Sequence, residues 1–495
     1  MKAKRTILFF LILSVLIPIP LVRPDPGWLT GWKKRVKITI DSGDVDTALT
    51  DFPVLIYLGN SSGINGEDVT FIFDEVGANS LKMAVTLSDG TTECYVEVEK
   101  WDFGSEAAWI WAKIQSISNI TDTEIYLYYD NDHADNVNFV GLTNSIPAEN
   151  VWDGDFAAVF HMADGVDNAH VYDSTGNSRD GIKGAADNPL QTILGKIGNA
   201  QDFNTDYMVF PAFNLNDYTI EAWVYPDVVN IIEVIISNDP PNNPQVYLRI
   251  TDANNLYWQS TDDEADHLFG TEAHGIGADI WHYWSLQVID TIGTIDIDLV
   301  EKGIDDNVNY GSQTFGTVYN IGRDPRGINY WDGCLDEIRV STIFRTEAWI
   351  KATYETDIDD LLDFGSEQTE LEEPNKLFGA GFNASAPYVV LRWASNLTDI
   401  DFFEIQNSTD KISWDYLGQS MTKQYTDLQV TNGLERFYRV RACNFTEGAW
   451  INSTFTDINF EKVYFVMGGG GLFPGLAIGI SLIIIAVMYF WETRR

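Results

Sequence analysis

Residues 331–350 read WDGCLDEIRVSTIFRTEAWI, and the first half of this stretch is typical of a buried β-strand. Asp336 and Glu337 lie next to each other there. Successive side chains of a regular strand point to opposite faces, so we expect Asp336 to share a face with Ile338 and Val340, and Glu337 to point the other way. Such a pair cannot act on one glycosidic bond, because a glycosidase holds its two acids about 5–10 Å apart across the substrate. Asp336 is therefore predicted to hold loop amides or a cation at the rim of a sheet.

The composition favours several β-rich domains. The chain has 495 residues, of which 45% are hydrophobic and 13% aromatic, including 16 Trp. This length allows about two to four domains, and the aromatic content favours β-structure and sugar-facing surfaces. The formal net charge of −42 argues against nucleic acid as a partner and suits cation binding. The three cysteines, Cys94, Cys334 and Cys443, do not make a disulfide framework and are expected to be buried or half-buried.

Both ends of the chain carry apolar runs. Residues 1–23 start with basic residues and continue apolar, which is typical of a secretory signal peptide, or of an uncleaved signal anchor because no A-x-A site follows. Residues 472–491 are long and apolar enough for a transmembrane helix, with residues 492–495 as a cytoplasmic tail. This end also resembles archaeal sorting signals that are cut and replaced by a lipid. We therefore expect a bilayer-anchored protein whose bulk lies at the cell surface or envelope.

Acceptor sequences for N-glycosylation support this placement. They occur at Asn60, Asn119, Asn383, Asn396, Asn407, Asn444 and Asn452. Five of the seven fall between 383 and 452, close to the predicted membrane segment. This distribution predicts a glycosylated stalk below a bare head.

Residues 28–150 contain β-branched and aromatic runs broken by Gly, Asn and Asp: RVKITI, FPVLIYL, VTFIF, CYVEVE, AWIWAKI and EIYLYY. This pattern predicts an antiparallel β-sandwich. The stretches GWKKRVKITID, LTDFPVLIYL, EDVTFIFD and IYLYYDN resemble a family of domains of unknown function that commonly precedes laminin-G-like lectin domains in surface proteins. The resemblance implies a module of a surface protein and no particular activity.

Residues 151–366 resemble that following partner, the concanavalin A-like or laminin-G-like jelly roll. The resemblance rests on VWDGDFAAVFHM (151–162), VYDSTGNSRDG (171–181), GKIGNAQDFN (195–204), YTIEAWVYP (218–226), WHYWSLQVI (281–289) and the stretch 331–350, in the family's order. It implies two facing antiparallel sheets.

The last third of the chain is predicted to hold a linker and one more sandwich. Residues 367–375, EQTELEEPN, are acidic and read as a linker. Residues 376–462 resemble a fibronectin type III domain, with VVLRW (389–393) as its second strand and Tyr438 in its tyrosine corner. The fold class is therefore all-β: tandem antiparallel β-sandwiches followed by one transmembrane helix.

Candidate ligand-binding residues lie in the lectin-like region. The loop 163–181 gathers several Asp among glycines, and related lectin-like domains often bind calcium at a rim loop, so Asp173 and Asp336 are the predicted cation ligands. The alternative for Asp173 is a turn in which the carboxylate caps its own backbone. Trp258 and Trp331 are candidates for stacking on sugars, with packing in the core as the alternative.

Two motifs suggest enzymes but depart from the required pattern. Asp296, Asp298 and Glu301 resemble the E-x-D-x-x-E motif of glucanases on this fold, with Asp where the first Glu belongs. The stretch GNSSG at 59–63 fits G-x-S-x-G, but turn-forming residues follow Ser61, where the hydrolase motif needs a helix. We therefore do not expect an enzyme.

The sequence as a whole predicts a membrane-anchored adhesion protein that recognises carbohydrate or a surface glycoprotein, with calcium as a possible cofactor. One alternative is a structural component of an envelope, surface layer or virion spike, whose contacts include self-association. The other is a polysaccharide hydrolase that uses Asp298 and Glu301.

Overall fold

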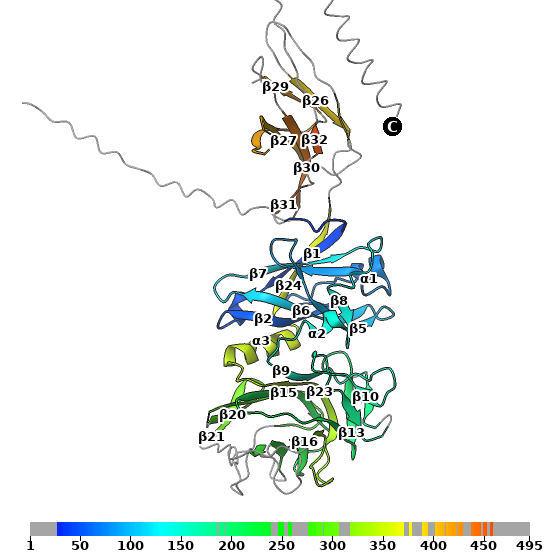
Figure 1. Cartoon of the computed structure of the whole chain (residues 1–495), viewed down its shortest axis with the longest axis vertical. Coiled ribbons are helices and arrows are strands. Elements are labelled where there is room, and N and C mark those ends of the chain that lie inside the picture. Colours follow the sequence, from blue (N-terminus) through cyan, green and yellow to red (C-terminus); the bar gives the residue numbers. More distant parts are fainter. Residues whose placement is uncertain are drawn as a thin grey trace, which may run out of the picture. The chain divides into compact units, whose positions relative to one another are not determined.

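The computed structural model describes residues 27–370, except 186–187, 194, 239–245, 252–255, 260–275, 291 and 306–316, and further on 376–378, 389–394, 401–410, 412–422, 424–428, 437–446, 449–452 and 456–458. The predicted signal at 1–23, the transmembrane segment at 472–491 and the tail at 492–495 lie outside these residues. Among the described residues, no helix is long and apolar enough to cross a membrane. The chain divides into two compact units between Thr369 and Glu370 (Figure 1).

The first unit begins with a sandwich of two sheets around one apolar core. In the described part of the chain, the order in one sheet is β24 (Leu362–Thr369), β1 (Lys34–Ile40), β7 (Thr123–Tyr129), β3 (Met83–Thr86) and β4 (Glu93–Cys94). The order in the other is β2 (Leu49–Leu58), β6 (Ala107–Ile117), β5 (Val96–Asp102) and β8 (Val140–Leu142), where β5 and β8 pair in parallel. Short helices η1 (Ser42–Asp44), α1 (Phe71–Val76) and α2 (Ile146–Glu149) connect the strands.

The second sandwich of this unit has larger sheets, again counted over the described residues. One sheet runs β10 (His170–Val171), β11 (Gly181–Lys183), β14 (Met208–Pro211), β22 (Val318–Ile321), β16 (Glu233–Asn238), β17 (Tyr247–Ile250) and β18 (Leu256–Gln259). The other runs β12 (Leu190–Thr192), β13 (Ala200–Asn204), β23 (Asp332–Ser341), β15 (Tyr218–Pro226), β19 (His282–Ile289), β20 (Ile292–Ile297) and β21 (Val300–Asp305), and β9 (Phe156–Phe160) also pairs with β23. The predicted all-β fold of tandem antiparallel sandwiches is thus confirmed.

The two sandwiches are interlocked along the chain. Strand β24 pairs with β1 from Lys34↔Thr369 to Ile40↔Leu362, so the chain returns to the first sandwich after completing the second (Figure 1). The predicted limits therefore need correction, because residues 362–366 do not belong to the second domain and 367–369 are not linker. A β-strand on the edge of β1 satisfies backbone groups that water would otherwise have to solvate.

Helix α3 (Glu347–Asp357) ties the two sandwiches together. Its N-terminus is capped by Thr346, whose hydroxyl accepts from the Trp349 amide. Near its C-terminus, the Thr356 hydroxyl accepts from the Leu55 amide of β2 at 3.0 Å. Asp357 accepts from the indole N–H of Trp223 on β15 at 2.9 Å. The helix therefore contacts one strand of each sandwich.

Two local predictions are wrong. The run VTFIF was expected to be a strand, but Phe71–Val76 form helix α1, in which Ile72, Phe73 and Val76 are buried. Their spacing places them on one helical face, which outweighs the β-propensity of the residues. The expectation of strict alternation in β23 also fails, and this has consequences for the site.

A β-bulge in β23 places both carboxylates on the same side. Trp223 and Glu221 of β15 are two residues apart, but their partners Asp336 and Arg339 are three apart, so β23 has one extra residue. Glu337 has a φ of 47° at this point. Leu335, Ile338 and Val340 join the core of the second sandwich, whereas Asp336, Glu337 and Arg339 face away from it.

The second unit contains two antiparallel sheets in its described segments. One comprises β25 (Lys376–Phe378), β26 (Val389–Ala394) and β29 (Gln424–Asp427), and the other β28 (Asp415–Ser420), β27 (Phe402–Ser408), β30 (Phe437–Thr446), β31 (Ala449–Asn452) and β32 (Thr456–Ile458). The buried Tyr438 donates its hydroxyl hydrogen to Asp427 at 2.9 Å. The fibronectin type III assignment stays a prediction.

Candidate functional site

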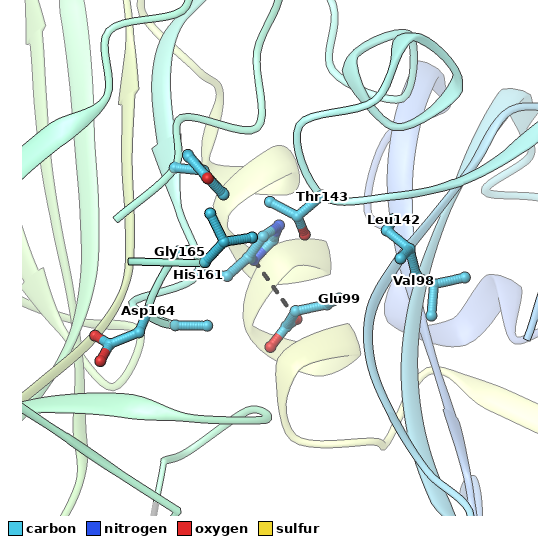
Figure 2. A pocket seen from close by; sticks show the side chains of 10 residues that line it. Val98, Glu99, Leu142, Thr143, His161, Asp164 and Gly165 are labelled. Atoms are coloured by element: carbon cyan, nitrogen blue, oxygen red, sulfur yellow. Dashed lines mark ion pairs between the residues drawn. The ribbon is translucent and has the colours of Figure 1, made fainter. Parts of the chain in front are cut away.

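A pocket of about 280 Å³ opens where the two sandwiches of the first unit meet. From the first sandwich it is lined by Val98, Glu99, Leu142 and Thr143, and from the second by His161, Ala163, Asp164, Gly165, Val166 and Tyr172. Figure 2 shows Glu99 and His161 pointing toward each other across this junction. The pocket leads to a cluster of buried charged side chains.

His161 is the centre of this cluster. It is the first residue after β9. Nearby, β23 stops pairing with β13, at Leu335, and starts pairing with β9, at Ile338. Only 2% of the His161 side chain is exposed. Its Nδ1 lies 2.7 Å from Glu337 Oε1 and 3.5 Å from Glu99 Oε2, and its Nε2 lies 3.4 Å from Glu97 Oε2. Burial alone would lower the pKa of His161, but the three carboxylates outweigh it and hold this pKa well above the usual value.

Arg339 connects this group to helix α3. It donates to Glu337 at 2.7 Å and to both oxygens of Asp357 at 3.0 Å. Burial raises the pKa of Asp357 to about 6 even though Arg339 opposes the shift. Burial also acts to raise the pKa of Glu337, but His161 and Arg339 reverse the effect and lower it.

Glu97 and Glu99 bring the first sandwich into the cluster from β5. Glu97 accepts from the Trp152 indole at 2.7 Å and from the hydroxyls of Thr143 and Ser174 at 2.7 and 2.8 Å. Glu99 is the extra residue of a second β-bulge, between Val98 and Lys100. The two bulges therefore direct the carboxylates of Glu99, from the first sandwich, and Glu337, from the second, toward the same junction.

The two oxygens of Glu99 have different surroundings. Oε2 accepts from the Trp111 indole at 2.8 Å, whereas Oε1 has no hydrogen-bond partner among the described residues. Burial raises the pKa of Glu99 to about 8, and the positive charge of His161 only partly offsets it. A buried oxygen without a partner is costly and marks a place where a ligand can bind.

Asp336 anchors a loop and does not lie at an exposed rim. Its two oxygens accept from the backbone amides of Ile197 and Glu337, both at 2.9 Å, and the residue is fully buried. Burial, reinforced by Glu337, holds its pKa well above the usual value. The predicted anchoring of loop amides is confirmed, and because both oxygens serve backbone donors, the structure favours this role over that of a cation ligand.

Asp173 is likewise a loop anchor. Its carboxylate accepts from the amides of Val159, Thr175 and Arg179 at 2.9–3.1 Å and from the Thr175 hydroxyl at 2.9 Å, and only 1% of the residue is exposed. Hydrogen bonds to both oxygens favour the capped turn, which was the alternative, over the cation ligand.

The two tryptophans predicted to stack on sugars are part of the core of the second sandwich. Trp258 and Trp331 are both 0% exposed. The indole N–H of Trp258 donates to the Tyr218 hydroxyl at 3.0 Å. Because neither ring presents a face to solvent, the prediction of sugar stacking is wrong for both residues.

The residues of the glucanase-like motif lie at a hairpin turn. Asp298 and Leu299, with φ of 50° and 61°, reverse the chain between β20 and β21. Asp298 is held by His282 Nδ1 at 2.8 Å and by the Tyr283 amide at 2.9 Å. Glu301 lies beyond the turn, opposite Asp296, so these acids do not follow one another along a single strand.

The remaining predicted sites have varied surroundings. Ser61 lies in a turn after β2, and the next helix, α1, starts only at Phe71. All three cysteines are free: Cys94 and Cys443 are buried and Cys334 is half-buried, as expected. Among the glycosylation acceptors, Asn60 and Asn119 are exposed and Asn407 is half-buried. Asn383 and Asn396 lie outside the described residues, and Asn444 and Asn452 lie in β30 and β31.

Sequence reasoning missed His161, Glu97, Glu99 and Arg339. One signal was available, since two glutamates alternate in the strand-like run CYVEVE and a lone histidine ends the apolar run VWDGDFAAVF. Nothing in the sequence indicated that these two places meet.

The comparisons with known proteins agree with the order of the two sandwiches. Residues 78–146 match the model of a domain of unknown function, DUF2341, and residues 202–351 match that of the concanavalin A-like lectin/glucanases superfamily. The predicted order of a domain of unknown function followed by a concanavalin-like domain is therefore confirmed. A search of curated proteins found no match.

Similarities to solved structures are remote. Domain 4 of AbnA, an extracellular arabinanase of Geobacillus stearothermophilus in complex with arabinotriose, is 19% identical, with 40% of this chain and 97% of that one covered and a TM-score of 0.33. Trypanosoma rangeli sialidase in complex with the inhibitor DANA is 12% identical over 54% of this chain and 44% of that one, with a TM-score of 0.34. The binding domain of botulinum neurotoxin serotype D is 9% identical over 60% and 73%, with a TM-score of 0.34. At these scores the similarities carry no argument about ligands.

Proposed function

We propose that this chain is a membrane-anchored surface protein that binds carbohydrate or the glycan of a glycoprotein in the pocket between its two interlocked sandwiches. The observation that carries the proposal is the pocket itself, in which carboxylates, a hydroxyl and an aromatic ring from both sandwiches converge. A concanavalin-like domain alone does not define a function, because this fold serves many.

The lining of the pocket suits a sugar. Lys183 and Gln201 both donate to Oδ1 of Asp164, so Oδ2 can accept from a ligand hydroxyl. Tyr172 is half-buried and can stack on the apolar face of a sugar ring. Gly165 makes room for it, because a Cβ at this position would lie only 2.9 Å from Cζ of Tyr172. The volume of about 280 Å³ is near the lower end of ligand pockets, in keeping with a terminal sugar rather than a long chain.

We expect binding rather than hydrolysis. Asp298 is occupied by His282 and Tyr283, and Glu301 lies on the following strand. Incubation with β-glucans is expected to release no reducing sugar, for the wild type and for Glu301→Gln alike. Release that Glu301→Gln abolishes would favour the hydrolase instead.

A glycan array probed with the purified full chain tests the proposal, with and without calcium. We expect binding to a limited set of glycans, and Tyr172→Ala is expected to weaken it by about tenfold or more, which corresponds to about 1.4 kcal/mol. Tyr416→Ala is the matched control, because Tyr416 is 61% exposed but lies in the second unit. An array without signal under both conditions, or equal binding by Tyr172→Ala, would contradict the proposal.

A further inference from the structure

The junction cluster contains a ligand set for a metal ion. Ligand atoms of Glu99, His161 and Glu337 all lie within 4.8 Å of one another. Two buried polar atoms of this group, Glu99 Oε1 and His161 Nε2, have no hydrogen-bond partner in the described part of the chain. Both residues line the pocket, which gives an ion a route from solvent to this group.

We propose that Glu99, His161 and Glu337 bind one divalent transition-metal ion, such as zinc or manganese, at the floor of the junction pocket. This site is distinct from the calcium ligands expected from the sequence. It does not depend on carbohydrate binding.

The distances fit such an ion. Zinc bonds to histidine nitrogen and carboxylate oxygen measure about 2.0–2.2 Å, which places neighbouring ligand atoms of a tetrahedral site about 3.3–3.6 Å apart. His161 Nδ1 lies 2.7 Å from Glu337 Oε1 and 3.5 Å from Glu99 Oε2. The His161–Glu99 pair already has this spacing, and the His161–Glu337 pair would open by about 0.6–0.9 Å around the ion. One imidazole and two carboxylates favour a transition metal over calcium, which prefers oxygen ligands throughout.

Neighbouring residues hold each ligand in position. Arg339 binds Glu337 Oε2 at 2.7 Å and leaves Oε1 for the ion. Trp111 donates to Glu99 Oε2 at 2.8 Å, which orients the Glu99 carboxylate beside His161. Glu97 lies 3.4 Å from His161 Nε2, which is the carboxylate–histidine arrangement that orients a metal-bound imidazole.

The charge of the cluster also favours a cation. Over the described residues, the cluster comprises two cationic side chains, His161 and Arg339, and five carboxyl groups, those of Glu97, Glu99, Asp336, Glu337 and Asp357. Buried charges are stable only when they are paired or bound to a metal. A dication held by Glu99, His161 and Glu337 would add positive charge where carboxyl groups outnumber cationic side chains, and the pocket leaves room for a further ligand.

Zinc titration of the full chain by calorimetry, after dialysis against a chelator and without carbohydrate, tests the site. We expect one zinc per chain and affinity at least about tenfold weaker in Glu99→Gln. Glu99→Asp keeps the charge and is expected to bind with intermediate affinity. Zinc is expected to raise the thermal midpoint of the wild type but not of Glu99→Gln.

The matched control is Asp298→Asn, which changes a second histidine–carboxylate pair, with His282 at 2.8 Å, outside the junction. It is expected to bind zinc like the wild type. No binding by the wild type up to about 1 mM zinc, equal binding by Glu99→Gln, or loss of binding in Asp298→Asn would overturn the site. If Glu99→Gln does not fold, the zinc affinity of Glu99→Asp replaces it as the test, and an affinity equal to that of the wild type would overturn the site. Failure here leaves the carbohydrate proposal standing, and an empty glycan array leaves this site standing.

Discussion

The two faces of strand β23 are equally buried, but one packs against apolar side chains and the other pairs with charged ones. On one face, Leu335 and Ile338 pack in the apolar core of the second sandwich. On the other, Glu337 and Arg339 form hydrogen-bonded ion pairs with His161 and Asp357. The apolar face needs only neighbours of suitable volume, whereas each charge on the other face needs a partner in a fixed position.

This difference shows how the sandwiches are joined. Apolar contacts alone would allow the first sandwich to slide on the second, since they are not directional. The charged face contacts His161, the residue after β9, and Asp357 of α3, and His161 in turn contacts Glu97 and Glu99 of β5 in the first sandwich. These partners define one relative arrangement, and the pocket is built from the same elements.

The largest expected effect comes from breaking the charged face. Arg339→Ala removes the guanidinium partner of the buried Asp357 and leaves Glu337 with His161 alone, and it should lower the free energy of unfolding by about 3–5 kcal/mol. Urea unfolding at neutral pH measures this change. A loss below about 1 kcal/mol would mean that the ion pairs do not hold the junction.

The apolar face gives the matched measurement. Leu335→Ala removes buried methyl groups on the opposite side of the same strand and should cost about 2–4 kcal/mol. Because no titrating group is involved, this loss should be the same at pH 5 and pH 8, whereas the loss in Arg339→Ala should shrink as Asp357 is protonated toward pH 5. An equal pH dependence of the two variants would contradict the comparison.

The pH dependence of the wild type follows from the raised pKa values. Glu99, at about 8, and Asp357, at about 6, bind protons more tightly in the folded state than unfolded Glu and Asp do at 4.5 and 3.8. Proton binding by these two carboxyl groups therefore stabilises the folded state. This stabilisation is complete below the unfolded pKa values and is lost as pH rises through the folded ones. His161 has the same sign, with stability present below its unfolded pKa of 6.5 and lost as pH rises through its raised folded value.

Between pH 5 and pH 8 the free energy of unfolding of the metal-free wild type should therefore fall by on the order of 2 kcal/mol. Urea unfolding across this range measures it. Glu99→Gln removes one of the titrating groups and should reduce the slope. A free energy that rises with pH, or an unchanged slope in the variant, would show that these groups do not titrate as described.

The smallest effect is expected away from the junction. Asp173→Asn replaces an acceptor of backbone amides and should lower the stability by about 1–2 kcal/mol. Thermal unfolding with and without calcium checks this, and calcium should not change the midpoint of either protein through this residue. A calcium-dependent rise in the wild-type midpoint that Asp173→Asn removes would restore the residue as a cation ligand.

The sequence was informative where structure is local. Runs such as YTIEAWVYP and CYVEVE form strands as predicted, although β15 is buried along nearly its whole length, and the order of the two sandwich families follows from their motifs. The sequence was uninformative about strands that pair with a segment far away along the chain. Residues 362–369, LDFGSEQT, have no feature that assigns them to β1 of the first sandwich, because backbone pairing carries little side-chain information.

The candidate site escaped sequence analysis for the same reason. Glu99 and Glu337 sit at bulges, which shift side chains between faces and are not visible in a hydrophobic pattern. Trp331 was a candidate for sugar stacking because an aromatic ring can serve either the core or a sugar, and only the packing of the second sandwich decides between them.

The most direct test of the account is native-state hydrogen exchange of the full chain, read by mass spectrometry. The pocket, the metal site and the charge network all require that the two sandwiches stay docked as one unit. The account predicts that peptides from β1, β24, α3 and β23 exchange with one common opening free energy, and that Arg339→Ala lowers all of them together. Exchange of β1 and β24 at a clearly lower free energy, with β23 still protected, would show that the sandwiches open independently and would contradict the account.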